Sequence, residues 1–126
     1  MTTMRLIAKN IDTDTVIAGH VTVARSAVDR AVGLLKHDRL EDGEGLLIVP
    51  CRGVHTCWMR FAIDIVALDR SGRVVDVVAG MRPWRIRLPR RGAVSVLELP
   101  AGSLARSNTR PGDRIGLEPM TAGAGA

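Results

Sequence analysis

The fold is decided by residues 50–69, PCRGVHTCWMRFAIDIVALD, which begin as a polar loop and end as an apolar run. This stretch holds both cysteines and the only phenylalanine of the 126-residue chain. The run at residues 63–68 is rich in branched aliphatic side chains, which favour a buried strand. Reactive side chains therefore stand where the chain leaves the core, and binding groups often converge on loops held by a scaffold in this way.

Short apolar runs separated by turn formers surround this stretch. Residues 63–68 and 73–79 are joined by DRSG and predict a tight hairpin. We expect this hairpin at the centre of a sheet, because both runs are apolar on both faces. The other runs predicted as strands are residues 4–9, 16–23, 46–49, 93–99 and 113–117, and residues 80–92 are predicted as a polar loop.

Two helices are expected beside the strands. Val28, Val32 and Leu35 recur at helical spacing after Ser26, which predicts a helix that Ser26 caps. A short second helix is predicted over residues 101–107.

The composition is that of one ordinary globular domain, since 46% of the residues are hydrophobic but only 2% are aromatic. An aliphatic core of this kind suits strands. Together the elements predict a mostly-β, single-domain, β-barrel-like fold of about seven short strands with one flanking helix and a short second helix. We expect it to span residues 1–120, with residues 121–126 as a disordered tail.

The charge and the cysteine content bear on partners and location. Eighteen lysines and arginines against 13 acidic residues give a net charge of +5, which weakly favours anionic partners. No apolar stretch approaches the roughly 20 residues that span a bilayer, and the N-terminus lacks the shape of a signal peptide. A cytoplasmic location with reduced cysteines follows as an expectation.

Four pieces of the chain carry a family resemblance: VARSAVDRAVGLLKHDRLEDGEGLLIVPC, HTCWMRFAIDIVALDRSGRVV, PWR and VLELPAGSLARSNTRPGDRI. Over about Val21 to Ile115 the chain resembles the domain-of-unknown-function 192 family, also called uncharacterised protein family 0127. The resemblance implies a small β-barrel-like fold and no established activity. Gly112 and Asp113 are also similar to the Gly-Asp turn of cradle-loop barrels, which bears on fold alone. Cys57 departs from the family pattern, where an aromatic residue or glycine is more usual.

Cys51, His55 and Cys57 form a C-x3-H-x-C pattern with several interpretations. A metal is one, although a closed zinc site needs a fourth ligand and the spacing is not that of a ribbon or finger. Cys51 as a nucleophile, with His55 as its base and Asp64 as the orienting acid, is the enzymatic version. In the structural interpretation the cysteines pack as small hydrophobes and the histidine is hydrogen-bonded at a strand edge.

Asp64 interrupts an apolar strand and should be buried. A buried carboxylate must be paired or must accept backbone hydrogen bonds, and Arg60 or Arg82 could serve as its partner. We expect Asp64 to act as a strut that fixes the loop at residues 51–56, with a catalytic role as the alternative. Glu98 raises the same question.

The arginine loop, Met81–Arg91, holds five arginines around Trp84. Trp84 could stack on a ligand or a base, but no RNP, KH or helix-turn-helix pattern accompanies it, so nucleic acid is not the expected partner. The simpler expectation is that Trp84 closes the barrel mouth while the arginines stay solvated. The glycines of the chain form no phosphate or dinucleotide fingerprint, so we expect no cofactor.

These features favour a non-enzymatic binding module for a small anionic ligand or an acidic partner. The binding cleft is expected where the Cys51–Trp58 segment meets the arginine loop. Its predicted contact residues are His55, Trp58, Arg60, Asp64, Arg82, Trp84 and Arg85. The alternative is an enzyme that uses Cys51, His55 and Asp64, with or without a metal.

Overall fold

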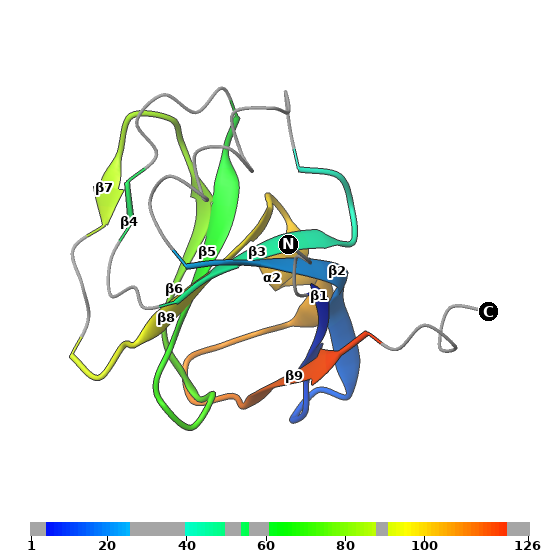
Figure 1. Cartoon of the computed structure of the whole chain (residues 1–126). Coiled ribbons are helices and arrows are strands. Elements are labelled where there is room, and N and C mark those ends of the chain that lie inside the picture. The colour runs from blue at the N-terminus through cyan, green and yellow to red at the C-terminus, as the bar shows by residue number, and fades with distance from the viewer. Residues whose placement is uncertain (1–4, 26–39, 50–53, 56–60, 88–90, 121–126) are drawn as a thin grey trace.

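A seven-stranded sheet forms the frame of the molecule in the computed structural model (Figure 1). The structure describes residues 5–25, 40–49, 54–55, 61–87 and 91–120. All neighbouring strands of this sheet run antiparallel except β2 and β3, which are parallel. From edge to edge the strands are β6 (Val74–Met81), β5 (Ile63–Leu68), β8 (Ser95–Pro100), β3 (Glu44–Ile48), β2 (Thr15–Ala24), β1 (Arg5–Asn10) and β9 (Ile115–Pro119).

The sheet curls into a half-barrel, and its two edges meet at one point. Arg73, before β6, forms an isolated antiparallel bridge with Arg114, before β9. Around this bridge, the N–H of Gly112 donates to the carbonyl of Val74 at 2.8 Å, and the N–H of Val74 donates to the carbonyl of Asp113 at 2.7 Å. The Gly-Asp turn thus joins the last strand to the opposite edge of the sheet. The predicted mostly-β fold is confirmed.

The core has two parts, because the middle strands are covered on both faces. The larger cluster draws side chains from all seven strands and the helix α2, so it fills the inside of the curl: Leu6, Ala8, Ala18, Val21, Leu47, Val66, Leu68, Val74, Leu97, Leu99, Leu104 and Ile115. A second cluster packs on the other face of β3, β5 and β8: Ala24, Leu46, Ile48, Ile63, Ile65, Met81 and Val96. Strands β5 and β8 are consequently buried at every position.

The helix α2 (Ser103–Ser107) confirms the short helix expected before the last strand. Gly102 precedes it at a φ of 98°, and Asn108 ends it at a φ of 53°, both in the left-handed region. The hydroxyl of Ser107 donates to the carbonyl of Ser103 at 2.8 Å, which holds the single turn together. The helix predicted from Ser26 and the predicted tail lie outside the described residues.

Asn10, at the end of β1, is fully buried and connects the first strand with the segment that precedes the last strand. Its side-chain amide donates to the hydroxyl of Thr109 at 3.1 Å and to the carboxylate of Asp113 at 3.0 Å. Its side-chain oxygen accepts from the backbone N–H groups of Asp12 and Thr13 at 3.0 and 3.1 Å. All the hydrogen-bonding capacity of this amide is therefore used within the fold.

The predicted hairpin at residues 63–79 forms, but its predicted central place is right for β5 and wrong for β6. β6 is an edge strand whose middle residues are half-buried. Its valines made it look central, yet valine favours any strand, so the composition does not separate an edge from a centre. The last strand also begins two residues later than predicted, at Ile115, because Asp113 belongs to the turn.

The loop predicted over residues 80–92 is wrong in part, because some of its described residues belong to strands. β6 continues to Met81, and β7 (Ile86–Arg87) pairs with β4 (Val54–His55) in a separate two-stranded sheet. We call this small sheet the ribbon. Figure 1 shows it beside β5 and β6, on the side of the molecule away from β1, β2 and β9.

Candidate functional site

The ribbon brings two distant parts of the sequence together. Val54 pairs with Arg87, and His55 pairs with Ile86, in antiparallel register. The first strand belongs to the cysteine-containing segment and the second to the arginine loop. The backbones of these two segments are thus neighbours beside the end of the main sheet.

Asp64 holds the base of the arginine loop. Its side chain is 1% exposed, and one carboxylate oxygen accepts the backbone N–H of Gly80 at 2.8 Å. The other oxygen accepts the N–H groups of Gly102 at 3.1 Å and Leu104 at 2.8 Å. Three main-chain donors therefore satisfy the buried charge.

These partners specify the expected role of Asp64. Its predicted burial is confirmed, and of the two kinds of partner that the sequence left open, the structure describes backbone donors. The strut fixes the end of β6 against the start of α2. Of the loop at residues 51–56 that it was expected to fix, only residues 54–55 belong to the described part of the chain.

Trp84 reverses the chain between β6 and β7. Its backbone φ of 62° lies in the left-handed region, which costs a residue other than glycine about 1–2 kcal/mol. Its side chain is 56% exposed, and Ile86, two residues on, is 71% exposed. These exposures do not place Trp84 against the inside of the barrel, so the expectation that Trp84 closes the barrel mouth stays a prediction.

A shallow hollow of about 410 Å³ lies between the end of β6 and the start of β7. We call it the arginine hollow. Two exposed arginines, Arg82 and Arg85, stand on its wall. No acidic residue occurs in residues 77–97, so the local charge of this part of the sequence is wholly positive. Its lining residues are Val78, Ala79, Gly80, Met81, Arg82, Arg85 and Ile86.

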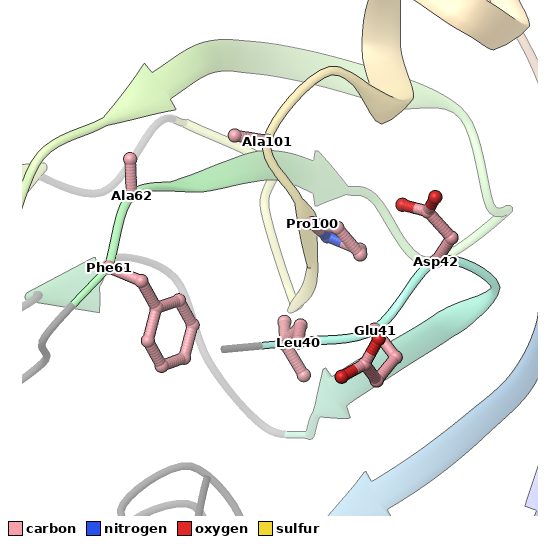
Figure 2. Close-up of a pocket in the computed structure, with 7 residues that line it drawn as sticks. All are labelled: Leu40, Glu41, Asp42, Phe61, Ala62, Pro100 and Ala101. Carbon is pink, nitrogen blue, oxygen red and sulfur yellow. The ribbon is translucent and has the colours of Figure 1, made fainter. Parts of the chain in front are cut away.

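A second hollow, of about 290 Å³, lies on the other side of β5 (Figure 2). Phe61, Leu40 and Pro100 provide its apolar walls, and Figure 2 shows Glu41 and Asp42 on the side away from Phe61. Asp42 forms an ion pair with Arg106 at 3.5 Å. This pair is largely exposed and contributes little to stability. Nothing in the sequence analysis had pointed to this hollow.

The structure brings only part of the predicted site together. Arg82 and Arg85 line the arginine hollow, Trp84 stands between them in sequence, and Asp64 anchors Gly80 beneath them. For His55, the structure describes the backbone pairing with Ile86. Cys51, Cys57, Trp58 and Arg60 lie outside the described residues, so the predictions that involve their side chains stay predictions.

Sequence reasoning missed the apolar part of the hollow. Val78, Met81 and Ile86 contribute to its lining alongside Gly80. Ile86 carried a usable signal, since it is an isolated branched residue between two arginines. The place of Gly80 could not be found from the sequence, because it depends on the distant partner Asp64.

Glu98 is fully buried on β8, where its cross-strand neighbours are Leu46 and Ile65. Its expected burial is confirmed.

Within the described part of the chain, no group of three or more histidine, cysteine, aspartate or glutamate side chains has the geometry to hold a metal. A helix with the length and apolar character to cross a bilayer is likewise missing from these residues.

Comparison with known proteins gives one consistent family. The DUF192 family model, described as "Uncharacterized ACR", matches residues 8–117. The UPF0127 protein PH1112 of Pyrococcus horikoshii is 34% identical over 103 residues, which cover 77% of this chain and 86% of that one. The UPF0127 protein PYRAB11210 of Pyrococcus abyssi is 32% identical over 103 residues, with coverages of 77% and 85%.

Two crystal structures share the fold. A protein of unknown function from Novosphingobium aromaticivorans superposes with a TM-score of 0.70 at 23% identity, covering 90% of this chain and 84% of that one. A protein from Sinorhizobium meliloti, assigned provisionally to transcription regulation, gives a TM-score of 0.72 at 20% identity, with coverages of 92% and 94%. At such identities the likeness speaks for the fold and not for the function.

Proposed function

This chain belongs to the DUF192 family, also called UPF0127, and from that premise we propose that it is a non-enzymatic binding module for an anionic group. The group is carried by a small ligand or by an acidic partner, and it binds at the arginine hollow. His55, Arg82, Trp84 and Arg85 are the proposed contacts, together with Trp58 and Arg60 from the neighbouring segment. Asp64 supports them from below.

The observation that carries this proposal is the pairing of His55 with Ile86 in the ribbon. It supports a site to which both the cysteine-containing segment and the arginine loop contribute. The guanidinium groups of Arg82 and Arg85 suit an anion because each offers several N–H donors in a planar fork. Residues 77–97 contain no acidic residue, and this also favours a negatively charged ligand.

The contacts of Asp64 are the reason for proposing binding rather than catalysis. An enzyme built on Cys51, His55 and Asp64 needs this carboxylate to orient the imidazole. Both of its oxygens instead accept hydrogen bonds from backbone N–H groups, and the side chain is buried. This gives Asp64 a structural task that accounts for its burial.

A titration with inorganic phosphate, and separately with a short polyglutamate peptide, tests the proposal on the full chain. We expect the amide signals of Gly80, Arg82 and Ile86 to shift in NMR spectra as the anion is added. Arg85→Glu reverses one charge of the hollow and should weaken the affinity about tenfold or more. His55→Ala should weaken it as well.

Arg70→Glu is the matched control, because Arg70 is an exposed arginine in the turn at the other end of the β5–β6 hairpin. It should leave the titration unchanged. If neither anion shifts these amide signals, or if Arg70→Glu weakens binding as much as Arg85→Glu does, the proposal is wrong.

A further inference from the structure

The tip of the arginine loop exposes two large apolar side chains, Trp84 and Ile86, which are separated in the sequence by Arg85. Trp84 is 56% exposed and Ile86 is 71% exposed. The only other large apolar side chains exposed to this degree among the described residues are Ile11 and Val16, which belong to the β1–β2 hairpin. Exposed apolar groups that share one tip usually mark a surface that another phase or molecule covers.

The backbone of Trp84 adds to this observation. A tryptophan in the left-handed region is under strain, and glycine would hold the same turn without it. Strained residues of this kind cluster at binding sites. Trp84 adopts this strained conformation while more than half of its surface is exposed.

The tip differs in its charges from the other arginine-rich surface of the molecule, which lies where the two edges of the sheet meet. At the meeting point of the sheet edges, the backbone N–H groups of three arginines each donate to a nearby aspartate, so opposite charges alternate there. The pairs are Arg73 with Asp69, Arg110 with Asp113, and Arg114 with Asp12. Around the tip, Arg82, Arg85 and Arg91 are exposed in a stretch that contains no acidic residue.

We infer that this tip docks on the surface of an anionic lipid bilayer, with a lipid phosphate in the arginine hollow and Trp84 and Ile86 at the headgroup level. This inference rests on the proposed function and names the source of the anion. Tryptophan favours the membrane interface, and each cationic side chain near an anionic leaflet adds to the attraction. A free phosphate in the hollow would cover little of the exposed apolar surface of Trp84 and Ile86, whereas a lipid surface covers both side chains.

The size of the tip also favours a bilayer over a folded protein partner. A stable protein interface covers roughly 800 Å² on each partner. Within the residues that the structure describes, each strand of the ribbon has two residues. A few apolar side chains ringed by cations are sufficient for reversible adsorption to an interface.

Flotation of the full chain with vesicles tests the inference. One set of vesicles contains phosphatidylcholine alone, and the other contains roughly one part in three of phosphatidylserine. We expect binding to the anionic vesicles only, and weaker binding as the salt concentration rises.

Two variants separate the lipid from the bare anion. Trp84→Gly removes the indole and suits the left-handed backbone, so this variant should fold at least as well as the parent. Combined with Ile86→Ser it should lower vesicle binding about tenfold or more, a larger factor than its effect on phosphate affinity, because Arg82 and Arg85 remain in the hollow. Arg85→Glu should weaken both, and Arg70→Glu neither.

Failure of the inference can be told from failure of the proposed function. If phosphate binds but anionic vesicles do not, or if the Trp84→Gly, Ile86→Ser variant floats as well as the parent, the lipid inference is overturned and the anion site stands. An acidic protein then becomes the partner to seek. If phosphate, polyglutamate and vesicles all fail to bind, both proposals are overturned.

Discussion

At the scale of single residues, Asp64 is the side chain on which the geometry of the arginine loop depends. Its carboxylate connects the end of β6 with the start of α2 through Gly80, Gly102 and Leu104. A carboxylate can accept this many bonds because its oxygens offer about four lone-pair positions. One acidic residue thus fixes two chain reversals at once.

We expect Asp64→Ala to lower the free energy of unfolding by about 3–5 kcal/mol, because three backbone N–H groups would lose their acceptor. In the parent protein one carboxylate oxygen accepts from Gly80, and the other accepts from both Gly102 and Leu104. Asp64→Asn keeps one acceptor oxygen and should cost about half as much. Chemical denaturation of the parent and both variants measures the difference. Equal stability of all three proteins would contradict the assigned role.

Asp64 also shows which features of a buried polar residue can be predicted from the sequence. The apolar neighbours of Asp64 were sufficient to predict that it is buried and satisfied. Its partners were beyond reach, because they lie 16, 38 and 40 residues away and offer main-chain donors that every residue except proline possesses. A pattern of side chains cannot point to a donor that carries no side-chain signature.

At the scale of elements, the closure of the sheet depends on Gly72, in the turn of the β5–β6 hairpin. Its φ is 87°, and its carbonyl accepts the N–H of Ile115 at 2.9 Å. A Cβ atom at this position would lie 2.8 Å from the carbonyl oxygen of Ile115. Neither backbone can move without opening the bridge between the two edges.

Gly72→Ala should therefore destabilise the protein by about 2–4 kcal/mol, from left-handed strain together with the clash against backbone. Gly43→Ala is a matched control, because Gly43 has the same φ of 87° and open space around its missing Cβ. It should cost only about 1 kcal/mol. Thermal unfolding of the two variants compares them, and an equal loss would show that the contact with Ile115 has no part in closing the sheet.

The elements themselves were more predictable than their neighbours. Short apolar runs and turn formers located every strand of the main sheet to within a few residues, because both signals are local in the sequence. Strand order is not local. The edge place of β6 depends on which strands pair, and the two-residue strand β7 is too short to carry a pattern.

At the scale of the whole molecule, Asn10 and Asp113 connect the first strand with the turn before the last. The hydrogen bond from Asn10 is the largest cause that holds the pKa of Asp113 below its ordinary value of 3.8, and the backbone N–H of Arg110 adds to it. A carboxyl group with a lowered pKa in the folded state stabilises the protein above its unfolded pKa. This stabilisation is lost as the pH falls through the lowered folded value.

Asn10→Ala should consequently reduce stability at neutral pH by about 2–4 kcal/mol and make the loss of stability below about pH 4 shallower than in the parent. Unfolding free energies measured from neutral to acidic pH check both parts. Asp113→Asn should flatten the same acidic region. An acid limb as steep in Asn10→Ala as in the parent would contradict the link between these two residues.

The position of β1 between β2 and β9 affects how the protein is made on the ribosome. The β1–β2 hairpin emerges early, but the outer side of β1 acquires its partner only when Ile115–Pro119 have been translated. Until then the nascent chain displays an open row of backbone donors and acceptors, and the amide of Asn10 waits for Thr109 and Asp113. A chain truncated before β9 would keep that edge open and would be prone to pair with other chains.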